Sequence, residues 1–147
     1  MQELVDSVCG PLKSRLSEHA IQTFLDVPSD QMITADPELL RRAVRNLVLN
    51  AVDAMPDGGS LFITSAAGPN ATELEVADTG ATLSDEQRRE AFELVPSSQR
   101  GGAGWGLAVV LRIAELHGGT VTVANCPEGG AAFTLRIPRV AAMEAAA

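Results

Sequence analysis

Three polar side chains interrupt the apolar stretch RNLVLNAVDAM at residues 45–55. Asn46, Asn50 and Asp53 are spaced by four and three residues, so in a helix they lie with Arg42 on one stripe about 80° wide. That stripe borders an apolar arc of Leu40, Leu47, Val48, Ala51 and Met55. Asparagine is a mediocre helix former, and its carbonyl oxygen suits a hard cation such as Mg²⁺ that already carries phosphates. The alternative is an amide-rich solvated face.

A carboxylate follows the strand-like segment TELEVAD at its end. Asp78 precedes Thr79-Gly80, so it lies where the chain turns tightly on a glycine. A carboxylate in this place can accept a hydrogen bond from a bound group such as an exocyclic amine. A plain turn is the alternative.

The segment QRGGAGWGLAVV carries glycines into the start of an apolar helix. The first-turn N–H groups of a helix are unpaired and attract anions. A P-loop is excluded because the chain's only lysine is Lys13. The dinucleotide fingerprint is excluded because Leu107 takes the sixth position counted from Gly102. A glycine-rich loop without a ligand is the alternative.

Composition narrows the function further. The 147 residues suffice for one domain, and the net charge of −8 leaves no basic surface for nucleic acid. Cys9 and Cys126 show no paired or CxxC spacing, which favours a reducing compartment, with a single disulfide as the alternative. No apolar run approaches the roughly 20 residues of a membrane span, so we expect a cytoplasmic domain without membrane contact. His19 and His117 lack a metal-ligand or nucleophile context, which favours structural roles for both.

The apolar spacing predicts an alternation of helices and strands. Helices are expected over 2–19, interrupted around Gly10-Pro11, and over 36–55, 85–92 and 105–119, with Asp36 capping the second. Strands are expected at 20–27, 31–35, 60–67, 72–78, 120–125 and 131–138, and a loop at 93–104. Hairpin connections cannot build a purely parallel sheet. The chain is therefore predicted to be α+β, a two-layer α/β sandwich with a mixed, mostly antiparallel sheet.

In this order and spacing the motifs resemble the ATP-binding domain of the sensor histidine kinases, in the GHKL superfamily with its Bergerat-type fold. NLVLNAVDAM resembles the N box, VADTGATLS the G1 box, AFELVPSSQ the F box, and GGAGWGLAVVLRIAELHGG the G2 box. The resemblance spans nearly the whole chain. It implies a sheet covered on one face by helices, with ATP held between the helices and a lid formed by residues 93–104.

The resemblance also implies roles for individual residues. Asn50 would help to hold Mg²⁺ on the triphosphate, with Asn46 and Asp53 near the phosphates, and Asp78 would read the adenine amino group. Arg100 would supply charge from the lid, where the family usually has a lysine and this chain has Gln99. Catalytic roles fall on Asn46, Asn50 and Arg100. ATP contacts would come from Asn46, Asn50, Asp53, Asp78, Gly80, Thr82, Gly102, Gly104, Gly106 and Leu107.

The activity implied is transfer of the γ-phosphoryl group of ATP to a histidine on a separate dimerisation domain, with a response regulator downstream. Residues 1–19 would lead from that domain, 20–139 would bind ATP, and 140–147 would be a tail. Asn46 replaces the glutamate base of the superfamily's hydrolases, which favours a kinase. Thr82 and Gln99 depart from the family pattern, as do Ala131 and Ala132, where a threonine is common. These departures keep open a degenerate nucleotide-binding or protein-interaction module without phosphotransfer.

Overall fold

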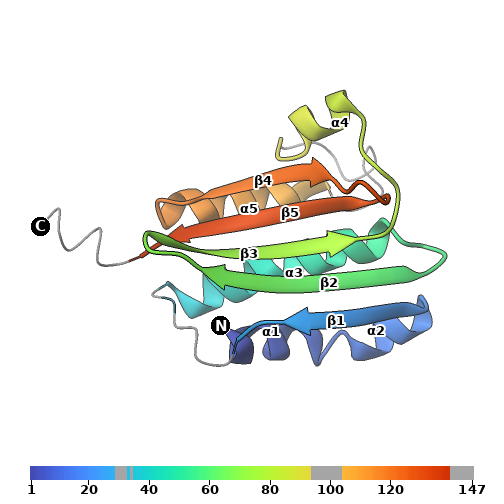
Figure 1. The fold of residues 1–147 in the computed structure, drawn as a ribbon, viewed down its shortest axis with the longest axis horizontal. Coiled ribbons are helices and arrows are strands. Elements are labelled where there is room, and N and C mark those ends of the chain that lie inside the picture. Colours follow the sequence, from blue (N-terminus) through green and yellow to red (C-terminus); the bar gives the residue numbers. More distant parts are fainter. Residues whose placement is uncertain (29–32, 34, 94–103, 140–147) are drawn as a thin grey trace, which may run out of the picture.

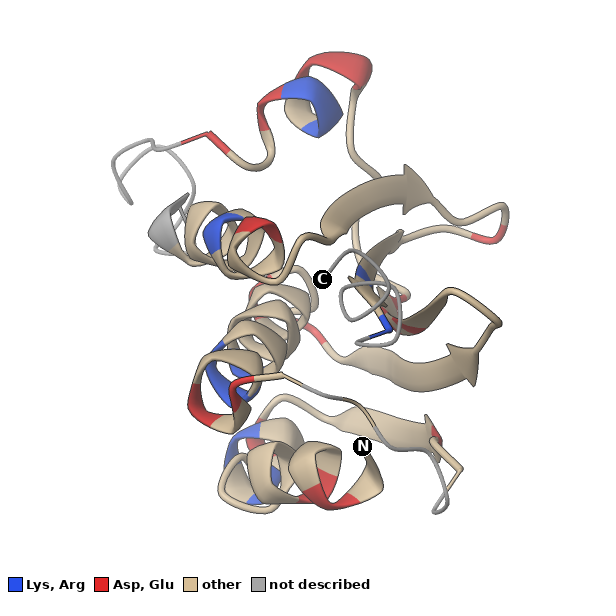
Figure 2. Cartoon of the chain, turned by 90° about the vertical axis from the view of Figure 1, so that its left-hand side faces the viewer, with Lys and Arg blue, Asp and Glu red and all other residues tan. Residues whose placement is uncertain are grey.

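The fold consists of a five-stranded sheet with helices on one face. The structure is a computed structural model that describes residues 1–28, 33, 35–93 and 104–139. Figure 1 views the open face of the sheet, and the edge-on view in Figure 2 shows the helices gathered on the other side. The predicted two-layer α+β architecture is confirmed.

Two hairpins and one parallel pair build the sheet. Its strands are β1 (Ile21–Asp26), β2 (Gly59–Ala67), β3 (Ala71–Asp78), β4 (Thr120–Asn125) and β5 (Ala131–Pro138). The spatial order is β1-β2-β3-β5-β4, with β1 parallel to β2 and every other pair antiparallel. The β2–β3 and β4–β5 hairpins follow from the predicted turns at 68–70 and 127–130. The parallel pair needs a crossover, and the long helix between β1 and β2 supplies it.

Five helices lie among the described residues. They are α1 (Gln2–Cys9), α2 (Lys13–Glu18), α3 (Pro37–Asp53), α4 (Asp85–Glu90) and α5 (Gly104–Leu116). The predicted break at Gly10-Pro11 separates α1 from α2. Most of the predicted strand at 31–35 lies outside the described residues, as do the lid from 94 to 103 and the tail. None of the described helices combines the length and apolar composition needed to cross a bilayer.

The core lies between the sheet and the α3 and α5 helices. From α3 it takes the seven buried side chains Leu40, Ala43, Val44, Leu47, Val48, Ala51 and Val52. Leu61 and Ile63 of β2 and Leu74 and Val76 of β3 meet them from the sheet. Burying each such leucine or isoleucine contributes about 1.5–3 kcal/mol. The opposite face of the sheet stays open, and Phe24 and Phe62 stack there with ring centroids 5.0 Å apart.

Polar contacts fix the start of α3. The Asp36 side chain accepts hydrogen bonds from the backbone N–H groups of Glu38 and Leu39 at 3.0 and 3.1 Å, and Pro37 occupies the first turn. The Asp36 backbone N–H donates to Nε2 of His117 at 3.0 Å, while His117 Nδ1 lies 2.8 Å from the Ile113 carbonyl. An Nε2 that accepts and an Nδ1 that donates define the neutral Nδ1–H tautomer. The C-terminal end of α5 is thereby attached to the N-terminal end of α3.

Asp36→Ala should lower the free energy of unfolding by about 1 kcal/mol, because it removes the acceptor for two orphan N–H groups of α3. Urea titration followed by circular dichroism measures the change. Asp57→Ala at an exposed turn position is the matched control, expected within about 0.5 kcal/mol of the parent. Equal losses in the two variants would contradict the capping role.

Candidate functional site

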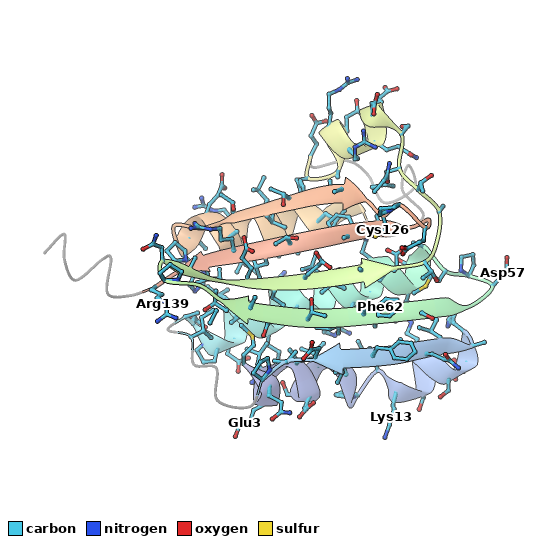
Figure 3. The ribbon with its side chains drawn as sticks, viewed as in Figure 1. Glu3, Lys13, Asp57, Phe62, Cys126 and Arg139 are labelled. Atoms are coloured by element: carbon cyan, nitrogen blue, oxygen red, sulfur yellow. The ribbon has the colours of Figure 1, made fainter. Side chains whose placement is uncertain are left out.

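Several chain segments meet at one end of the sheet. Figure 1 shows the C-terminal ends of α3 and β3, the start of α5 and the β4–β5 turn together at this end. Figure 3 places the labelled Asp57 and Cys126 there, with Arg139 at the far end. The antiparallel packing of α3 and α5 produces this arrangement, because it brings the C-terminal half of α3 beside the N-terminus of α5.

The polar edge of α3 contacts the start of α5 directly. The Asn46 side chain donates from Nδ2 to the carbonyl of Gly106 at 3.3 Å. One helical turn further along, the half-buried Asn50 lies on the same edge of α3. The structure thus brings Asn46 and Gly106 together, as expected for residues of one site.

Asp53, the third member of the stripe, is near α2. Asp53 lies at the surface, and partial desolvation by the surrounding protein raises the pKa of its carboxyl group above the usual 3.8. The positive charges of Arg15 and His19 on and just after α2 act in the opposite direction and lower it. These charges show that the carboxylate lies within electrostatic reach of α2. A role for Asp53 toward phosphates stays a prediction.

Asp78 is a buried carboxylate at the end of β3. Its side chain is 3% exposed, and Oδ1 accepts hydrogen bonds from the backbone N–H groups of Gly80 at 2.8 Å and Ala131 at 3.4 Å. Burial raises its pKa above the ordinary 3.8, while these two hydrogen bonds lower it in part. Asp78 thus offers a buried hydrogen-bond acceptor, which suits an amino group.

The backbone around Asp78 is packed too closely for side chains at two glycines. A Cβ at Gly80 would collide with the carbonyl of Ala54, at the end of α3. A Cβ at Gly130, whose φ is +89°, would collide with the carbonyl of Asp78 itself. Both glycines are therefore required for α3, β3 and the β4–β5 turn to approach one another.

The remaining predicted residues divide into three groups. Leu107 is buried in the core against α3 and the sheet, 4% exposed. Thr82 is exposed on the loop after β3, and Gly104 is the first residue of α5. Arg100 and Gly102, with Gln99, lie outside the described residues, so their roles stay predictions.

Sequence reasoning missed Asn125, at the end of β4. Its carboxamide accepts from the Leu83 N–H at 2.9 Å and donates to the Leu83 carbonyl at 2.8 Å. Arg88 of α4 donates to the same carbonyl at 2.9 Å. In the sequence, an asparagine close to a Pro-Glu-Gly-Gly turn is explained by the turn itself. Only the tertiary structure shows that Asn125 lies opposite the loop after β3 and binds it.

Comparisons with known proteins identify the family of the chain. A family model described as "Histidine kinase-, DNA gyrase B-, and HSP90-like ATPase" matches residues 35–141. The sensor histidine kinase ZraS of Klebsiella oxytoca is 38% identical over 117 residues, 79% of this chain and 25% of ZraS. The nucleotide-free catalytic domain of histidine kinase ThkA shares the fold, with a TM-score of 0.86 at 24% identity over 94% of this chain and 93% of that chain. The structure of full-length ShkA in complex with AMPPNP has a TM-score of 0.81 at 32% identity, and the match covers 92% of this chain and 29% of that chain.

The chain belongs to the histidine kinase-, DNA gyrase B- and HSP90-like ATPase family. Within that family it is a catalytic domain of the sensor histidine kinase type. The resemblance to the sensor histidine kinases that the sequence predicted is thereby confirmed. The chain spans about a quarter of the length of ZraS, since the match covers 25% of it.

Asp78→Asn should stabilise the domain at pH 7. The amide oxygen can still accept from Gly80 and Ala131, but the buried charge is gone. Because the folded-state pKa of Asp78 is raised, its ionisation opposes folding above that pKa, and this cost disappears as the pH falls toward 3.8. Urea titrations of both proteins from pH 7 to pH 4 should show a gap that narrows on acidification. A gap that widens would contradict this, and Asp57→Asn controls for the substitution.

Gly130→Ala and Gly129→Ala form a matched pair. Both residues have positive φ, +89° and +107°, but a Cβ at Gly129 meets nothing within 4 Å. Each substitution costs about 1–3 kcal/mol of backbone strain. Gly130→Ala should cost a further 1–3 kcal/mol or so through its collision with the Asp78 carbonyl. Thermal unfolding of both variants measures the difference, and equal melting temperatures would refute the close approach.

Proposed function

We propose that this domain binds ATP together with Mg²⁺ and presents the γ-phosphoryl group for transfer to a histidine on another domain. The observation that carries this proposal is the hydrogen bond from Asn46 to Gly106. It holds the polar edge of α3 against the glycine-bearing start of α5, where unpaired N–H groups favour a triphosphate. Membership of the kinase family supports the same choice of ligand.

Asn50 is the proposed Mg²⁺ ligand. Its carboxamide is half-buried on the edge of α3 that also carries Asn46, and a neutral carbonyl oxygen suits a hard cation. No cluster of three or more His, Cys, Asp or Glu side chains within the described ranges could hold a metal ion. The proposed site therefore takes Mg²⁺ together with the phosphates, as Mg²⁺ commonly binds in nucleotide enzymes. When bound, the ion would neutralise charge on the phosphates.

Asp78 is the proposed adenine-reading residue. Its Oδ1 is held by two backbone N–H groups, which fixes the carboxylate in one orientation. A fixed, buried acceptor discriminates strongly between a base that donates at the matching position and one that does not. We therefore propose selectivity for ATP over GTP, with Gly80 and Thr82 beside the base.

The residues favour phosphoryl transfer to a side chain over hydrolysis. Asn46 stands where the hydrolases have a glutamate base, and its amide nitrogen donates to the Gly106 carbonyl. Its carboxamide has no basic group with which to deprotonate a water molecule. What the domain contributes is positioning and charge neutralisation, which is most of what phosphoryl transfer requires. In the transfer the γ-phosphorus leaves the β–γ bridging oxygen and forms a bond to the imidazole nitrogen of the acceptor.

The acceptor histidine is proposed to lie on a separate dimerisation domain. Both ring nitrogens of His117 are engaged, Nε2 by the Asp36 N–H and Nδ1 by the Ile113 carbonyl, and His19 lies against the carbonyl of Arg15. A response regulator is the proposed downstream partner, and ThkA has been solved in complex with one, TrrA. We further propose that residues 20–139 bind ATP and 1–19 lead from the dimerisation domain, although Val5 and Leu16 already pack into the core. The 140–147 segment would be a tail.

Calorimetric titration tests the nucleotide site. The parent domain should bind a non-hydrolysable ATP analogue saturably, more tightly with Mg²⁺ than without, and in preference to GTP. Asn50→Ala should reduce the Mg²⁺-dependent gain, and Asp78→Asn should weaken binding by at least about tenfold through loss of a charge-assisted hydrogen bond.

Asn70→Ala, at the opposite end of the sheet, is the control and should bind like the parent domain. Unchanged affinity in both site variants would overturn the residue assignments. Absence of any binding by the parent at millimolar nucleotide would favour the degenerate module instead.

A further inference from the structure

Asn125 binds one residue of the loop after β3 at both backbone positions. Its Oδ1 accepts from the Leu83 N–H at 2.9 Å, and its Nδ2 donates to the Leu83 carbonyl at 2.8 Å. Arg88 of α4 reinforces that carbonyl at 2.9 Å. The two elements are 42 residues apart in the sequence, so this contact is purely tertiary. In Figure 3 the neighbouring Cys126 marks the end of the sheet at which it lies.

The β4–β5 hairpin therefore holds the loop at residues 79–84 at both ends. At the first end, the Ala131 N–H of β5 and the Gly80 N–H both donate to the Asp78 carboxylate. At the second end, Asn125 of β4 holds Leu83, whose side chain packs against the core. Between these attachments Ala81 and Thr82 are exposed. The path of the exposed part is thus determined by the two attachments.

We propose that Asn125 is a positioning residue for the nucleotide site, fixing the loop that borders Asp78. The inference rests on the proposed binding of ATP at Asp78. Thr82, on this loop, is one of the residues proposed to lie beside the base. A loop ordered before the ligand arrives costs less conformational entropy on binding, so the carboxamide of Asn125 should contribute to affinity without touching the nucleotide.

The exposure of Asn125 separates this role from a general structural one. Its side chain lies on the surface, outside the buried core, and exposed hydrogen bonds contribute little to global stability. Removing the carboxamide should therefore release the loop while the domain stays folded. The sheet register of β4 does not depend on this side chain, because backbone pairing with β5 sets it.

The test compares Asn125→Leu, which keeps the approximate size and removes both hydrogen bonds, with Asn125→Asp, which keeps only the acceptor for the Leu83 N–H. Asn70→Leu makes the same chemical change at an exposed position at the other end of the sheet. Four quantities are measured on each protein. They are the melting temperature, the hydrogen-exchange rate of the Leu83 amide without ligand, and the dissociation constants of Mg-ATP and of Mg-tripolyphosphate.

We expect Asn125→Leu to exchange the Leu83 amide at least about tenfold faster and to weaken Mg-ATP binding about tenfold, as the loss of two modest hydrogen bonds implies. Its affinity for Mg-tripolyphosphate, which lacks a base, should match that of Asn70→Leu. Asn125→Asp should fall between the leucine variant and the parent, because it retains one of the two bonds.

Equal ATP affinity in Asn125→Leu and Asn70→Leu would overturn the inference. Equal losses for ATP and tripolyphosphate, or a large drop in melting temperature, would also overturn it, since they indicate a general structural role. If the parent domain does not bind ATP, the proposed function fails by itself. The exchange rate measured without ligand then still reports whether Asn125 holds the loop.

Discussion

The burial of α3 between the sheet and its neighbouring helices is the constraint on which the rest of the structure depends. Its seven buried side chains fix the rotation of the helix, and this rotation leaves Asn46 and Asn50 at the margin of the core. Polar contacts join α3 to both ends of α5. The Asp36 backbone N–H donates to His117, and the Asn46 side chain donates to the Gly106 carbonyl. A helix held in this way cannot turn its amides away from the site without exposing core side chains to water.

A second feature of the structure is that the buried carboxylate of the candidate site lowers the stability of the fold. Asp78 holds a carboxylate where burial opposes its charge, and Gly80 and Gly130 leave no space for side chains around it. Groups that are unfavourable for folding are typical of functional sites. The close backbone packing gives this buried acceptor a fixed direction, which a flexible surface carboxylate would lack.

Much of this was predictable from local patterns. The spacing of Leu40, Leu47 and Ala51 against Asn46 and Asn50 defines which face of α3 is buried, since helix geometry alone determines it. Asp36-Pro37 predicts the start of that helix and the Gly68-Pro69-Asn70 turn predicts the hairpin of β2 and β3, both of which the structure confirms. The order of the four motifs also sufficed for the family, because the glycines and polar residues follow one another at characteristic distances.

The sequence by itself therefore determined the elements, the family and which side chains are candidates for binding a nucleotide. Only the tertiary structure determined which of these side chains lie close to one another. It brings Asn46 to Gly106, relates the charge of Asp53 to Arg15 and His19, and joins Asn125 to Leu83. Such pairs join residues distant along the chain, and local propensity carries no information about them. They follow from the order of strands in the sheet and from the antiparallel packing of α3 and α5, which the whole core determines together.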